Sequence, residues 1–225
     1  MFCNSGPWCA GLLAAAVLAF WPSYLSRPFG PVDVYTHVHA VAMATWCALL
    51  VVQPTLIRFG RRRLHRALGK VSFVLAPAIV VAAFLLVHLR MQSMPRRYFD
   101  GGAFGFYLPL AFIALFGTCY ALAIRYRRRP AIHAAFMLGT GLTFIDPVLS
   151  RIIAFYGPAL APDWYPVITF TTIDLLLAVI VARVRGPTLP FLLGGFALVE
   201  AGWYLVARSD GWLSFAVWYR DLPIT

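Results

Sequence analysis

Residues 34–70 read VYTHVHAVAMATWCALLVVQPTLIRFGRRRLHRALGK. The first part, 34–57, is an apolar run long enough for a helix, which rises about 1.5 Å per residue, to cross a hydrocarbon core of about 30 Å. The second part, 58–70, is rich in basic side chains. An apolar run that leads into a short basic segment is typical of a transmembrane helix that ends at the cytoplasmic face.

The composition of the whole chain also indicates a membrane protein. The 225 residues are 61% hydrophobic and only 12% charged, whereas soluble domains have roughly 45–50% apolar and about 25% charged residues. This excludes a soluble globular protein. The net charge of +11 does not indicate nucleic-acid binding, because the basic residues are divided among short segments beside apolar runs and no domain presents them together.

Similar apolar runs recur along the chain, each bounded by Pro, Gly or charged residues. We therefore predict an all-α fold, a single polytopic bundle of seven transmembrane helices that occupies residues 1–225. The first run is interpreted as an uncleaved helix because no Lys or Arg precedes it; without it, six spans remain. The predicted spans cover residues 8–26, 34–57, 70–90, 103–125, 131–156, 164–183 and 188–207.

The distribution of basic residues predicts the orientation. Most of the 19 Lys and Arg residues fall into the three alternate loops after the second, fourth and sixth spans. Short cytoplasmic loops accumulate Lys and Arg, so the N-terminus is predicted inside and the C-terminus outside a bacterial inner (plasma) membrane. The tail, 208–225, carries Trp212, Phe215 and Tyr219 at helical spacing, which predicts an aromatic segment at the headgroup level.

The five histidines lie at or near the ends of predicted spans. Two histidines that face each other at one depth can hold a b-type haem through one axial nitrogen each. The outer side offers His39 with His88, and the cytoplasmic side offers His65 with His133. Polar capping of the helix ends is the alternative reading. No C-x-x-C spacing occurs among the four cysteines, so no metal site is predicted from them.

Four ionisable residues fall inside the predicted spans. Such residues are costly in a bilayer and by default mark a function or a buried pair. Counted along the helices, Asp146, Arg151, Asp174 and Glu200 occupy overlapping depths in the outer half of the membrane, which predicts one polar cluster. The alternative is a structural role: Pro147 leaves the carbonyl of Thr143 without its helical donor and bends the span there.

One segment resembles a known group of proteins. Leu64-His65-Arg66-Ala67-Leu68-Gly69 matches the L-H-R-x-L-G cytoplasmic loop of an uncharacterised bacterial polytopic membrane protein family, a domain of unknown function. His39, Gln53 and His133 match other positions of that pattern, and residues 127–133 match its second basic loop. The resemblance covers about residues 34–156, and more distantly the layout is similar to membrane b-type cytochromes. It implies a helical membrane fold and haem.

Several functions follow as expectations. The first is a haem-associated electron-transfer protein of the b-type cytochrome kind. The second is a transporter or proton-coupled carrier that uses the intramembrane acids. A metal-dependent membrane hydrolase, with His37 or His39 and Asp146 or Asp174 around zinc, ranks last, beside a non-catalytic assembly factor. No residue is identified as catalytic. The expected partners are the lipid bilayer and a membrane protein or a second copy of the chain.

Overall fold

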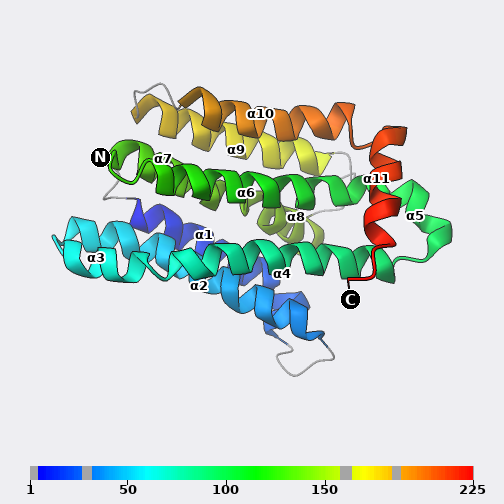
Figure 1. Ribbon diagram of the computed structural model, residues 1–225, viewed down its shortest axis with the longest axis horizontal. Coiled ribbons are helices and arrows are strands. Elements are labelled where there is room, and N and C mark those ends of the chain that lie inside the picture. The colour runs from blue at the N-terminus through cyan, green and yellow to red at the C-terminus, as the bar shows by residue number, and fades with distance from the viewer. Residues whose placement is uncertain (1–4, 27–31, 158–163, 184–188, 225) are drawn as a thin grey trace.

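A computed structural model of the chain describes residues 5–26, 32–157, 164–183 and 189–224. Across these residues the secondary structure is helical and contains no strand. The long helices run side by side, while the short helices α5 and α11 lie at one end of the bundle and α3 lies at the other (Figure 1). The predicted all-α bundle is confirmed.

The helix bounds follow the apolar runs closely. The helices are α1 (Gly6–Phe20), α2 (Val34–Arg58), α3 (Arg62–Gly69), α4 (Ser72–Ser93), α5 (Arg96–Gly102), α6 (Tyr107–Arg125), α7 (Pro130–Leu142), α8 (Ile145–Tyr156), α9 (Trp164–Arg183), α10 (Leu189–Leu205) and α11 (Asp210–Arg220), with a π-helical turn η1 (Trp21–Leu25) after α1 and a 3-10 turn η2 (Ala103–Phe106) before α6.

The described helices include six that are long and apolar enough to cross a membrane, and a seventh if α10 and α11 are counted together. The first apolar run is among the six. The axis turns by 100° between α10 and α11, so α11 does not continue the direction of α10 but crosses the end of the bundle (Figure 1). The chain is a multi-pass membrane protein in its architecture.

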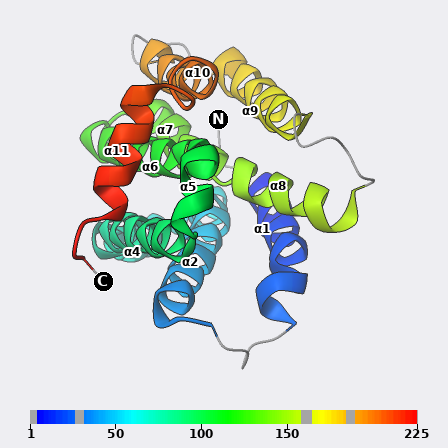
Figure 2. The ribbon, with the colours of Figure 1, turned by 90° about the vertical axis from the view of Figure 1, so that its right-hand side faces the viewer.

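Three apolar clusters hold the helices together. One lies among α6, α7, α9 and α10, and its central members include Phe196 and Ile173. A second joins α1, α2, α4 and α6 around Trp46, whose side chain is completely buried. The third packs α11 against α4, α5 and α6. Figure 2, which views the bundle nearly end-on, shows α1 between α2 and α8.

Close helix approach occurs at the small residues of α7. A Cβ atom added to Gly139 would lie 2.8 Å from Leu192 Cδ1 and 3.2 Å from Cys119 Sγ. Ala135, one turn earlier, is buried in the same cluster. Small residues at this spacing let helix backbones approach closely in a membrane, and here they admit α6 on one side and α10 on the other.

The fifth span is broken where the proline predicts a bend. α7 ends at Leu142, Thr143 and Phe144 form a turn, and α8 begins at Ile145. Pro147 has no N–H to offer the carbonyl of Thr143. The Thr143 hydroxyl donates to the Thr140 carbonyl at 2.8 Å, so the side chains at the break bond locally. Asp146 consequently stands in the first turn of a new helix.

The basic segment between the second and third spans differs from a simple loop. Gly60, whose φ of 71° suits glycine, turns the chain, and α3 follows it. The apolar residues Leu64 and Leu68 are one turn apart, and Arg62, Arg63 and Arg66 fall on other faces of the helix, which is the pattern of a helix at a membrane surface. The second basic segment, 125–129, joins α6 and α7 at the same end of the bundle (Figure 1).

The aromatic tail is helical, and part of it packs on the protein. The Trp212 indole N–H donates to the Ala103 carbonyl at 2.9 Å and the Tyr219 hydroxyl donates to the Phe84 carbonyl at 2.8 Å. Phe215 and Trp218 remain exposed. A salt bridge of 2.7 Å between Arg96 and Asp221 fixes the end of α11 to the start of α5.

Candidate functional site

Asp146 is the most enclosed of the predicted intramembrane acids. Its side chain is 7% exposed, and its Oδ1 atom has no hydrogen-bond partner among the described residues. It stands in the first turn of α8, where the helix dipole favours a negative charge. Thr169 and Tyr165 of α9 lie beside it. A buried carboxyl with a free oxygen is costly unless it has a task or a ligand.

Arg151 lies on the same helix and within electrostatic range of Asp146. Its Nη1 donates to the Pro147 carbonyl at 2.9 Å. The guanidinium carbon lies 4.5 Å from the centre of the Phe20 ring of α1, a cation–π contact that keeps the charge at this depth. Asp146 and Arg151 therefore place one negative and one positive group near each other on α8.

Two further groups reach Arg151 from other helices. His39 of α2 lies within its electrostatic range, and the His39 Nδ1 atom is buried with no hydrogen-bond partner in the described ranges. Arg90 of α4 also interacts with Arg151 through its charge. Three helices, α2, α4 and α8, thus direct polar side chains into one region.

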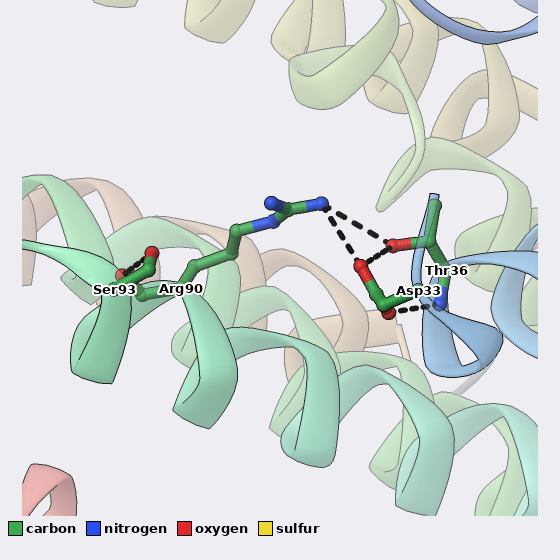
Figure 3. Close-up of polar contacts among 4 residues, drawn as sticks. All are labelled: Asp33, Thr36, Arg90 and Ser93. Atoms are coloured by element: carbon green, nitrogen blue, oxygen red, sulfur yellow. Dashed lines mark hydrogen bonds and ion pairs between the residues drawn. The ribbon is translucent and has the colours of Figure 1, made fainter. Parts of the chain in front are cut away.

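Arg90 ties this region to the start of α2 (Figure 3). Its Nη2 atom lies 3.6 Å from Asp33 Oδ2 and donates to the Thr36 hydroxyl at 3.2 Å. Asp33 is the N-cap of α2 and accepts from the Thr36 N–H at 2.8 Å. Slight burial raises the pKa of the Asp33 carboxyl, but the Thr36 N–H, the Thr36 hydroxyl and the Arg90 charge together hold it below its ordinary value.

The Asp33 cap gives a pH-dependent contribution to stability. Because the folded pKa lies below the unfolded value, the contribution is present at neutral pH and is lost as the pH falls below about 4. Asp33→Ala is expected to lower the free energy of unfolding by about 1 kcal/mol. Asp33→Asn should cost less, because the amide oxygen of asparagine can still accept the capping hydrogen bond. Between neutral and acid pH, the thermal stability of the Asp33→Asn protein should fall less than that of the wild type. An identical pH response in both proteins would contradict this assignment.

The two remaining acids form a separate pair. Asp174 of α9 and Glu200 of α10 lie within electrostatic range of each other. Asp174 is exposed on the surface of the bundle, whereas the Glu200 Oε1 atom is buried and has no hydrogen-bond partner among the residues placed in the structure. The predicted cluster of four thus appears as two pairs, Asp146 with Arg151 and Asp174 with Glu200.

The histidines predicted on the outer side, His39 and His88, have different neighbours. His88 is fully buried, and neither ring nitrogen has a hydrogen-bond partner in the described part of the chain. Its ring meets the edge of Tyr219 of α11 at a centroid distance of 5.3 Å. His39 instead lies near Arg151 of α8. His37 bonds to the Tyr24 hydroxyl through Nδ1 at 2.7 Å.

The histidines predicted on the cytoplasmic side, His65 and His133, lie near each other, and their Nδ1 atoms are both engaged. His65 of α3 and His133 of α7 interact through their charges. His133 Nδ1 bonds to the Ala123 carbonyl at 2.9 Å. With the Gln53 amide turned so that its oxygen accepts from the Gly69 N–H at 3.0 Å, its nitrogen donates to His65 Nδ1. The carbonyl makes Nδ1 the N–H donor of His133 and leaves its Nε2 with a lone pair, whereas the Gln53 amide makes Nδ1 the acceptor of His65 and leaves the proton of a neutral ring on Nε2.

Sequence reasoning missed the partners of the acid–arginine pair. Arg90 counted only toward the topology, and Tyr165 and Thr169 are unremarkable in a membrane span. A usable signal for Arg90 was its position at the end of the third predicted span, on the same predicted side of the membrane as the start of the second span. Nothing in the sequence singles out the two α9 residues.

The described residues contain no group of three or more His, Cys, Asp or Glu side chains that could hold a metal ion. Cys9, Cys47 and Cys119 are buried free thiols, and Cys3 lies outside the described residues. One cavity of about 270 Å³ lies between η2 and the α10–α11 turn, and another of about 250 Å³ lies between α4 and α6. No histidine lines either of these two cavities.

Comparisons with protein-family models, with curated proteins and with solved structures find no match to this chain. The helical, multi-pass architecture therefore rests on the sequence and the structure themselves.

Proposed function

We propose that this protein is a proton-coupled carrier of a bacterial inner membrane, with Asp146 as the residue that takes up and releases the proton. The observation that carries the proposal is the buried, unpartnered Oδ1 of Asp146 at the break between α7 and α8. Carriers commonly place their sites where a membrane helix is interrupted, because the free helix ends supply polar backbone groups in mid-membrane.

The neighbours of Asp146 can interact favourably with both the ionised and the protonated form of its carboxyl. When it is ionised, Arg151 and the α8 N-terminus stabilise its charge. When it is protonated, its hydroxyl can donate a hydrogen bond, and Thr169 and Tyr165 of α9 offer polar oxygens beside it. Proton uptake therefore changes what Asp146 does to both α8 and α9, which is the requirement for coupling a proton to a change in helix packing.

A proteoliposome assay tests the proposal. Vesicles that hold the protein and an internal pH dye are challenged with a panel of small anions, cations and neutral solutes. At least one solute is expected to drive a proton flux, and Asp146→Asn is expected to reduce that flux at least tenfold. Asp100→Asn, which removes an exposed carboxyl from α5, is the matched control and should behave as the wild type. Equal flux in the Asp146→Asn protein would overturn the proposal.

A haem-associated, electron-transfer role is the second candidate, and one observation favours it on the cytoplasmic side. His65 and His133 are neighbours, and His133 donates its Nδ1–H to the Ala123 carbonyl, as is usual for an imidazole that ligates through Nε2. A haem b there would supply one-electron chemistry. On the outer side His39 and His88 have separate neighbours, which gives that pair less support. A reducible Soret band that is lost in His133→Ala would support the cytoplasmic site, and no such band after expression with haem would overturn it.

A further inference from the structure

The charges around Arg151 limit what the carrier can bind. Arg90 has a counter-charge in Asp33, at 3.6 Å, and Arg151 has one in Asp146. With both acids ionised, the two arginines and the two carboxylates balance. His39 adds no charge when neutral, and its buried Nδ1 has no hydrogen-bond partner in the described structure.

Protonation of Asp146 removes one of these counter-charges. Arg151 then faces Arg90, which repels it, and His39, which cannot neutralise it. The remaining polar side chains on the packed helices offer hydroxyl groups: Tyr165 and Thr169 on α9, and Tyr24 of η1, which bonds to His37. The region gains one unit of positive charge at a depth where an unpaired charge is costly.

We infer that the solute carried with the proton is a small monoanion, held by Arg151 with His39 and Arg90 and bound when Asp146 is protonated. The inference rests on the proposed carrier function. A guanidinium matches a carboxylate or similar oxyanion with two parallel hydrogen bonds, and the His39 ring can add a third. One proton and one monoanion restore the balance that the ionised Asp146 provides in the empty site.

The arrangement also excludes other solutes. A cation would meet two arginines from α4 and α8 in addition to the histidine. A neutral solute would leave the charge on Arg151 uncompensated. A dianion would exceed the single positive charge that one proton creates, because Asp33 remains bound to Arg90. The site is therefore selective for one negative charge per proton.

A binding experiment with matched probes tests this inference. Benzoate, benzamide and benzylamine share a ring, which suits the Phe20 side of the site, and differ in charge. We expect benzoate to raise the thermal unfolding temperature of the protein in nanodiscs, more at pH 5.5 than at pH 7.5, and the other two probes to have no such effect. Arg151→Gln is expected to weaken benzoate binding at least tenfold, and Asp146→Asn to make it independent of pH.

Arg97→Gln is the matched control, because Arg97 is an exposed arginine of α5 that stacks on Tyr98; it should bind benzoate as the wild type does. If Arg151→Gln alone does not fold, the double variant Asp146→Asn/Arg151→Gln, which removes both charges, must show the loss. Equal binding of benzamide, or of benzoate to the Arg151 variants, would overturn the inference, as would no benzoate binding at all. Proton flux that is driven only by cations would overturn it and leave the carrier function standing, whereas benzoate binding with no solute-driven proton flux would overturn the carrier function.

Discussion

Arg151→Gln is expected to lower the free energy of unfolding by about 3 kcal/mol at neutral pH, because it removes the positive charge that acts on a buried carboxylate and leaves that carboxylate uncompensated. The residue left behind is Asp146, which is 7% exposed. At acid pH the loss should shrink, since Asp146 can then take a proton and become neutral. The measurement is reversible unfolding of the protein in mixed micelles at two pH values.

The double variant Asp146→Asn/Arg151→Gln separates structure from transport. It removes both charges and is expected to recover most of the stability lost in Arg151→Gln, because no buried charge remains without a partner. Its solute-driven proton flux should nevertheless stay absent. Additive losses of stability in the double variant would show that the two side chains act independently.

Trp46→Ala is expected to cost about 3 kcal/mol of unfolding free energy, at the lower end of the range for aromatic truncations in packed cores. Trp46 is completely buried, meets Phe116 and Tyr120 edge-on at 5.1 and 5.5 Å, and its Nε1–H donates to the Thr140 hydroxyl at 3.2 Å. That bond joins α2 to α7 just before the break in the fifth span. The side chain therefore supports α7 directly ahead of the break that precedes Asp146.

Two further variants divide the role of Trp46 into its parts. Trp46→Phe keeps most of the packing and loses the hydrogen bond, so it should cost about 1 kcal/mol. Trp8→Ala removes an indole that is 77% exposed on α1 and should leave the packing between the helices of the chain unchanged. If Trp46→Ala and Trp8→Ala were equally mild in thermal unfolding, the central position assigned to Trp46 would be incorrect.

The sequence predicted the features that depend on position along a helix axis. The apolar runs correspond to the observed spans, and Pro147 correctly indicated a break at Thr143. Both rely on local physics, namely the thickness of the bilayer and the missing N–H of proline. The helical α3 within the basic segment 58–70 was not predicted, because eight residues with an arginine-rich face carry a weak apolar signal.

The sequence did not predict the direction in which each side chain points around its helix axis. Asp146 and Asp174 have similar predicted depths, yet the first is enclosed beside Arg151 and the second is exposed beside Glu200. The direction of a side chain around a helix depends on which neighbours pack against it, and those neighbours come from distant segments. Arg90 and Tyr165 belong to the Asp146 region for the same reason.

The contact between α1 and α8 has a consequence for how the protein is made. The two helices are neighbours in space (Figure 2). In the sequence, however, α1 comes before and α8 comes after most of the helices that surround Asp146 and Arg151. During synthesis α1, α2 and α4 enter the bilayer first, with Phe20, His39 and Arg90 in place before their partners exist. Arg151 and Asp146 arrive with α8, and Tyr165 follows with α9. Biogenesis thus places Phe20, His39 and the balanced Asp33–Arg90 pair first and adds Asp146 and Arg151 late, so the two opposite charges on α8 enter the membrane as one nearly neutral unit.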